Sequence, residues 1–200
     1  MLEQELLYAV TEETVIQQKT FENERLISAN GEKVTFDNIS FIKCQFSGGN
    51  FEAAEFVDVI FDGCDLSNCR YHNAYFKNCS FTNCKADGSN FGSAIFKNVK
   101  MENCSFVYCN FVADIWEATV TTDCDMKESF FSEVKFKKPV FHNVNFTSTD
   151  FFRTKLKSID LSDCVISGIM LSDTFTELAG AKVNIYQAAD LAKLLQVQIV

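Results

Sequence analysis

The fold is decided by residues 34–61, which read VTFDNISFIKCQFSGGNFEAAEFVDVIF. A phenylalanine stands at every fifth position of this stretch, from Phe36 to Phe61. The rhythm continues along the chain, where 17 of the 21 phenylalanines, between Phe36 and Phe151, lie five residues apart or at multiples of five. A period of five fits neither the 3.6-residue period of a helix nor the two-residue alternation of a strand. The stretch is therefore part of a repeat in which the chain bends every five residues.

Two further positions of each repeat are as regular as the phenylalanine, which we call the centre. Two residues before the centre comes a small or β-branched side chain, as at Val34, Cys44 and Ala54, and all nine cysteines fall in this phase. Two residues after the centre, turn-forming residues such as Asn68 and Asn78 are common. This arrangement predicts a short side and a corner in every repeat, with two of five side chains directed inward.

The pattern resembles the pentapeptide-repeat family over residues 34–173, with a weaker continuation back through Leu26 and Phe21. In that family four repeats form one square turn and the turns stack into a column. The resemblance implies an all-β solenoid, a right-handed quadrilateral β-helix of pentapeptide repeats with a C-terminal capping α-helix. Residues 20 apart then stack, and one interior line is the expected structural core: Phe36, Phe56, Phe76, Phe96, Trp116 and Phe136.

The open ends of such a column need covers, because unpaired strand edges promote aggregation. The strict pattern is lost in residues 1–33, which we expect to form an N-terminal cap on the repeat column of residues 34–175. Residues 176–200 are expected to form a C-terminal helix, cap and dimerisation segment. Asn184 as N-cap and Gln187 at the third helical position predict a helix over about 185–195.

The C-terminal residues narrow the resemblance. Leu178-x-Gly180, then Tyr186-Gln187-Ala188 and a leucine-rich helix, look like the corresponding segment of the quinolone-resistance (Qnr-like) pentapeptide proteins. Members of that group dimerise through this segment, so the resemblance implies a homodimer interface at Tyr186, Leu191, Leu194 and Leu195. The alternative is a helix that only closes the last turn of a monomer, because capping alone explains an apolar face.

The nine cysteines raise the question of a metal or redox site. Six of them share one interior line under the 20-residue stacking: Cys44, Cys64, Cys84, Cys104, Cys124 and Cys164. A parallel ladder points every sulfur the same way, whereas tetrahedral zinc needs ligands that converge. Parallel Cβ directions also oppose a disulfide. We therefore expect the cysteines to act as small packing residues, with no metal and no cofactor.

No arrangement of residues predicts catalysis. His72 and His142 fall in an outward phase, and no phosphate-binding or metalloprotease motif occurs. One turn breaks the pattern, because Asp114 stands at an inward small position near Trp116 and Thr121 stands at a centre. Either Asp114 is hydrogen-bonded to turn amides in a local bulge, or the turn is a kink or binding feature halfway up the column. We expect the protein not to be an enzyme.

Charge narrows the set of partners. The chain has 27 acidic and 18 basic residues and a net charge of −9, which argues against direct binding of nucleic acid or anionic lipid. The outward carboxylates gather on two adjoining sides, and those expected to bind a partner are Asp62, Asp65, Asp87, Asp123, Asp125, Asp160 and Asp163. A further side instead stacks Lys77, Lys97, Lys137 and Lys157, interrupted by Glu117.

The resemblance implies a non-catalytic DNA mimic that engages a type II topoisomerase, DNA gyrase or topoisomerase IV, and so affects quinolone resistance. The basic side argues against a mimic that uses the whole rod. The alternative is a generic protein-interaction scaffold with another partner. The first residues lack the features of a signal peptide, and no apolar run is long enough to span a membrane. We therefore expect a cytoplasmic protein without membrane contact.

Overall fold

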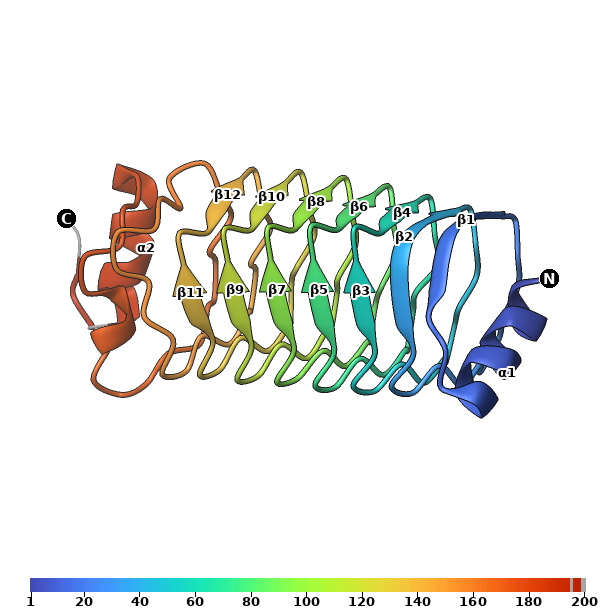
Figure 1. The fold of residues 1–200 in the computed structure, drawn as a ribbon. Helices are drawn as coiled ribbons and strands as arrows, with labels where there is room; N and C mark the ends of the chain where they lie inside the picture. The colour runs from blue at the N-terminus through green and yellow to red at the C-terminus, as the bar shows by residue number, and fades with distance from the viewer. Residues whose placement is uncertain (195, 199–200) are drawn as a thin grey trace.

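The computed structural model describes residues 1–194 and 196–198. The chain forms one four-sided column of stacked coils, with helix α1 (Leu2–Glu12) against one end and helix α2 (Ile185–Leu194) against the other (Figure 1). The predicted all-β solenoid with a C-terminal helix is confirmed. Neither helix has the length and the apolar sequence that crossing a bilayer requires, among the residues described.

The strands lie in two rows that run along the column (Figure 1). We call the row of β3, β5, β7, β9 and β11 side 1 and the row of β4, β6, β8, β10 and β12 side 2. Two long strands, β1 (Ile16–Glu22) and β2 (Thr35–Ile42), turn the corner between these sides. The short strands of side 1 are β3 (Glu55–Val57), β5 (Tyr75–Lys77), β7 (Ile95–Lys97), β9 (Ile115–Glu117) and β11 (Lys135–Lys137). Those of side 2 are β4 (Ile60–Asp62), β6 (Ser80–Thr82), β8 (Lys100–Glu102), β10 (Val120–Thr122) and β12 (Val140–His142).

All strand pairs are parallel and join residues 20 apart. Phe36 pairs with Phe56, which pairs with Phe76, so four repeats make one turn. The other two sides keep the same offset through isolated bridges. Side 3 follows β4 in the coil and has centres such as Phe46 and Leu66, and side 4 has centres such as Phe51 and Tyr71.

The corners explain the turn-forming phase. The residue two after the centre adopts positive φ in nearly every repeat, for example +55° at Asn78 and +52° at Asp123. Asparagine, aspartate and glycine accept this left-handed conformation at least cost. Tyr108 and Lys138 adopt it too, with φ of +60° and +55°. The stacking of neighbouring coils therefore overrides the local preference of individual residues.

The aromatic centres stack along the axis of the column. The ring centroids of Phe36 and Phe56 are 4.9 Å apart with 3° between planes, and those of Phe56 and Phe76 are 4.8 Å apart with 4°. Trp116 interrupts the series, because its ring is tilted by 52° to Phe96 and is perpendicular to Phe136. The expected core line is buried from Phe36 to Trp116, and Phe136 is only half-buried.

The cysteines fill the second inward phase. All nine are free and buried, and seven thiols lie near backbone carbonyls of the preceding coil, as in the 2.9 Å contact from Cys69 Sγ to the Phe46 oxygen. Burial raises the pKa of the Cys69 thiol to about 11 and that of Cys79 to about 12. Cys69 and Cys79 therefore stay protonated, and the buried cysteines act as small packing residues between coils.

The N-terminal cap is shorter than predicted. β1 already pairs with β2 at the 20-residue offset, so the column begins at Ile16 and not at residue 34. Gly31 stands at a centre position, where an added Cβ would lie 2.7 Å from Cδ1 of Phe51. Leu6 of α1 packs beside it. Because Gly31 has no side chain, the five-residue pattern of large apolar residues is broken in this coil. The Phe51 ring of the next coil and Leu6 of α1 fill the space.

The C-terminal helix begins with the predicted capping box. The Asn184 amide donates to Gln187 Oε1 at 2.8 Å, and the Gln187 amide donates to Asn184 Oδ1 at 2.9 Å. Gln187 also donates through Nε2 to the carbonyl oxygens of Leu161 and Cys164. One side chain thus begins the helix and satisfies acceptors of the last coil. The predicted helix end at residue 195 falls outside the described residues.

The stacked core predicts a large cost for removing one ring. We expect Phe76→Ala to lower the free energy of unfolding by about 3–5 kcal/mol, because it leaves a cavity between two stacked rings. Urea denaturation followed by circular dichroism measures this change. Phe136→Ala is the matched control and should cost less, because that ring is half-exposed. Equal losses in the two variants would contradict this account of the core.

Candidate interaction surface

The outward side chains form ladders because every repeat exposes the same three positions. The interior is filled with packed side chains, so the candidate functional surface is the outside of the column. Coils spaced by about 4.8 Å place equivalent residues in lines parallel to the axis. Each side of the column therefore presents its own line of charges, and the four sides differ.

Side 2 has a group of carboxylates at its three outward positions, and we call this group the acidic ladder: Asp62, Glu102, Asp123, Asp160 and Asp163. Glu102 was not among the carboxylates predicted to bind a partner. Within the described part of the chain, no lysine or arginine forms a salt bridge with any of the five. Ser162 donates from its hydroxyl and its amide to Asp160, and these bonds lower the pKa of that carboxyl. The ladder is thus free to meet cations of another molecule.

The carboxylates predicted on side 3 have local partners instead. Asp87 lies 3.7 Å from Lys85 Nζ, and Asp125 lies 3.4 Å from Lys127 Nζ. Asp65 accepts the Ser67 amide at 3.0 Å, which fixes a turn. The seven predicted residues therefore do not form one continuous acidic face. Four belong to the acidic ladder, and the three on side 3 contribute to the column itself.

Side 1 is basic, as its sequence predicts. Lys77, Lys97 and Lys137 follow one another at the same position of successive coils, with Glu117 between the last two. The Glu117 carboxylate lies 3.9 Å from Lys97 Nζ and 3.5 Å from Lys137 Nζ. The next coil adds Lys157 on the same line. Acidic and basic ladders thus run along adjoining sides of one rod.

The acidic ladder carries fewer negative charges per unit length than DNA does. The ladder rises by five steps between coils, or about 24 Å at ~4.8 Å per step, and has five carboxylates, or about one per 5 Å. Each strand of a DNA duplex carries one charge per ~3.4 Å, and the duplex one per ~1.7 Å. The column therefore offers one acidic side, which is less dense than a nucleic acid strand, rather than a charged rod.

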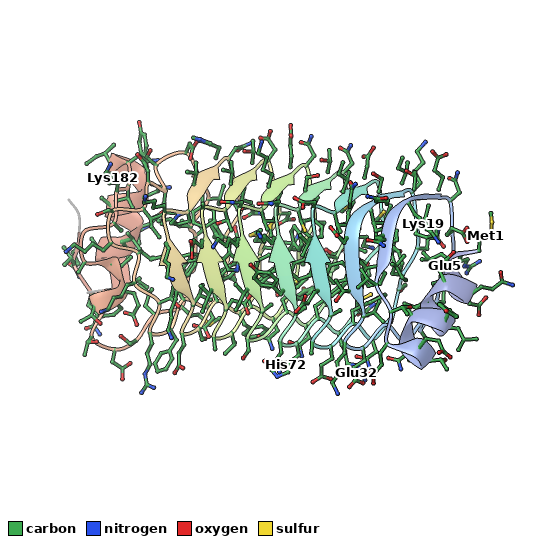
Figure 2. The ribbon with its side chains drawn as sticks, in the orientation of Figure 1. Met1, Glu5, Lys19, Glu32, His72 and Lys182 are labelled. Atoms are coloured by element: carbon green, nitrogen blue, oxygen red, sulfur yellow. The ribbon has the colours of Figure 1, made fainter. Side chains whose placement is uncertain are left out.

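The two histidines lie on different sides of the column. His72 projects outward from side 4 (Figure 2). His142 belongs to side 2, where its Nδ1 is 3.3 Å from Asp163 Oδ2. Neither ring forms a hydrogen bond with a serine or cysteine among the described residues. The described geometry thus gives no activated nucleophile.

The irregular turn has a structural explanation. Asp114 is fully buried, and its carboxylate accepts the Ala94 amide at 2.9 Å and the Trp116 Nε1–H at 3.4 Å. Ser89 and Ser129 use the same position in their coils to accept an amide from the coil before. Pairing continues through this turn at the 20-residue offset, without a bulge or a kink. Hydrogen bonding to a turn amide was the first of the two readings, and the structure favours it.

Burial raises the pKa of the Asp114 carboxyl well above its usual range, although the bonds from Trp116 and Ala94 oppose the shift. Nearby, Thr121 is buried at a centre, and its hydroxyl has no hydrogen-bond partner within the described protein. These polar side chains lie inside the column, so they are not part of the outer surface. We therefore expect Asp114 and Thr121 to affect the stability of the fold.

Comparison with known families agrees with this repeat geometry. A family model described as a pentapeptide repeat region matches residues 54–121, and a model of eight copies of the pentapeptide repeat matches residues 36–70 and 131–168. The chain belongs to the pentapeptide-repeat family. The first coil, formed by residues 16–35, lies outside both matches, and its strand pairing identifies it as part of the same column.

Solved structures of this kind are similar to the chain at low identity. QnrB1 in a trypsin-treated form, a plasmid-mediated fluoroquinolone resistance protein, is 19% identical with a TM-score of 0.43, over 94% of this chain and 100% of that one. HetL from Nostoc sp. strain PCC 7120, a pentapeptide repeat protein involved in heterocyst differentiation regulation, is 12% identical with a TM-score of 0.40, over 85% and 92%. A search of curated proteins finds no match.

The buried acid predicts a pH dependence of stability. Because the folded-state pKa of Asp114 is raised, its protonated form contributes stability that is fully present below the unfolded value of about 3.9 and is lost as pH rises through the folded value. We expect the free energy of unfolding of the natural chain, minus that of Asp114→Ser, to rise as pH falls from about 7 to 4. Denaturation at a series of pH values tests this, and a difference that stays constant would contradict it.

Proposed function

We propose that this protein is a non-catalytic interaction column whose acidic ladder binds a basic, DNA-binding surface of another protein. The observation that carries the proposal is a group of five carboxylates along side 2 that have no lysine or arginine partner within the described chain. Their spacing is set by the backbone pairing of the coils, so the charges are held in place before a partner arrives. Preorganised charges steer association and fix its register.

A type II topoisomerase, DNA gyrase or topoisomerase IV, is the partner we propose. Such enzymes hold DNA against basic surfaces, and the C-terminal residues of this chain resemble those of the quinolone-resistance group. The lysines of side 1 would be repelled by the same surface, so binding should use side 2 alone. In this mode the protein competes with DNA for gyrase and alters inhibition by quinolones. Both proteins would meet in the cytoplasm.

The exposed face of α2 supports a homodimer. Leu191 packs against the core, whereas Ile185 and Tyr186 are 75% and 81% exposed. Leu194 is also exposed at the end of the helix, and Leu195, the fourth predicted contact, lies outside the described residues. Two columns joined through this face would extend the acidic ladder into a rod about twice as long.

The gyrase proposal is tested with a triple variant of the acidic ladder. We expect the natural protein to inhibit DNA supercoiling by purified gyrase, or to relieve its inhibition by a quinolone, and Asp62→Asn/Glu102→Gln/Asp123→Asn to lose most of this effect. The control Glu32→Gln/Glu52→Gln/Glu133→Gln removes the same charge from side 4 and should keep it. No effect of the natural protein at high concentration, with or without a quinolone, would favour a scaffold for another partner.

The dimer proposal is tested by solution mass. Light scattering should give twice the chain mass of 22.6 kDa for the natural protein. Tyr186→Asp should shift the mass toward the monomer, because it places a charge in the proposed interface. Leu7→Asp, a similar change to an exposed residue of α1 at the other end, should leave the mass unchanged. A natural protein that is monomeric at high concentration would contradict this arrangement.

A further inference from the structure

The backbone ladder is interrupted at one place in the described column. On sides 1 and 2 the strand pairing stops at β11 and β12, although the repeat continues in the sequence at Leu156 and Leu161. On their other edge, residues 155–162 pair with the C-terminal segment, as in the bond from the Leu156 amide to the Glu177 oxygen at 2.9 Å. On sides 3 and 4, isolated bridges still pair neighbouring coils at this height of the column, as between Asn145 and Val165. A slit therefore opens between β11 and the coil that follows it.

The part of the slit on side 1 contains a cavity. A cavity of about 560 Å³ lies between β11 and the next coil, and its lining includes Val134, Lys135, Phe136, Arg153 and Lys155. Phe136 is half-buried here, whereas the equivalent Phe76 and Phe96 are fully buried. The edge of β11 thus presents an aromatic ring beside backbone groups that no strand of the described chain pairs.

The rim of this slit is basic. Lys135 and Lys137 lie on the β11 side of the slit, and Lys155 and Lys157, each 20 residues later, lie on the next coil. Arg153 is paired with Glu133, and Lys137 with Glu117. For the other three lysines, no carboxylate among the described residues lies within salt-bridge distance. Like charges on neighbouring strands are destabilising, and this cluster occurs in a chain with a net charge of −9.

Protection of an exposed edge accounts for part of this pattern. Lysines and proline discourage unwanted strand pairing, and Pro139, the only proline, directly follows β11 and Lys138. Edge protection does not account for a cavity that exposes Phe136 beneath the lysines. A ligand with an apolar group between two anionic groups would satisfy both features.

We propose that this slit binds an extended acidic peptide segment of another protein, which adds to β11 as a strand. Outward carboxylates of the segment would face Lys135 and Lys137, and an apolar side chain between them would cover Phe136. Main-chain hydrogen bonds provide affinity in this mode of recognition and alternate side chains provide specificity. A nucleic acid offers the charge but not the peptide backbone. Asp160 and Asp163, which line the side 2 part of the slit, confine the segment to side 1.

The proposal is independent of the acidic ladder and is tested with a defined peptide. The probe is a fluorescent Glu-Val-Glu-Val-Glu peptide, followed by anisotropy at low salt with the full chain. We expect Lys135→Glu/Lys155→Glu to weaken binding by at least about tenfold. Lys77→Glu/Lys97→Glu makes the same charge change on the same side, away from the slit, and should change the affinity by less than about twofold. Circular dichroism checks that both variants are folded.

Two further probes separate strand addition from charge attraction. The same peptide with N-methylated amides keeps its carboxylates and should bind at least about fivefold more weakly, because it cannot donate to the edge strand. A single-stranded oligothymidylate should not displace the peptide at equal concentration. Absence of peptide binding at about 1 mM, equal weakening by the two lysine variants, equal affinity of the methylated peptide, or tighter binding of the oligonucleotide would each overturn the proposal.

Discussion

The structure depends on backbone hydrogen bonds between residues in consecutive coils at a constant offset of 20. The offset holds only because each repeat is five residues long and each side contains one repeat. A buried amide without a partner is costly, so an insertion of one residue would misalign every later bond in its coil. The polar residues inside the column follow the same requirement: Asp114, Ser89 and Ser129 accept amides from the coil before.

The same offset makes the surface functional. Side chains at equivalent positions are brought into lines, so a few charges per coil become extended ladders with fixed spacing. Side 2 gathers carboxylates, side 1 lines up lysines, and side 3 pairs its charges locally. A partner therefore meets a different surface on each side of one rigid rod, and no side chain has to move to create it.

At the two ends of the column, the 20-residue pairing between coils stops and other segments cover the last coil. At the start, Leu6 of α1 and the Phe51 ring fill the space that Gly31 leaves in the first coil. Near the other end, residues 155–162 pair with the segment before α2 on one edge and are not paired with β11 and β12 on the other. Glu177, almost fully buried, helps to hold this closing segment, because its carboxylate accepts amides from Arg153 and Ser172. Closing one end of the column thus opens a slit one coil earlier.

The amino-acid sequence by itself determined the repeat, the inward and outward positions, the cysteine packing and the capping box at Asn184 and Gln187. These features depend on a period of five and on local chemistry, which are visible in one dimension. It did not determine the coil formed by residues 16–33, because Gly31 removes the centre that marks a repeat. Only the tertiary structure showed that Asp87 and Asp125 are paired whereas Asp62 and Asp123 have no lysine or arginine partner in the described chain. It alone decided that pairing stops after β11, because the sequence repeat continues through Leu156 and Leu161 and no local pattern records the interruption.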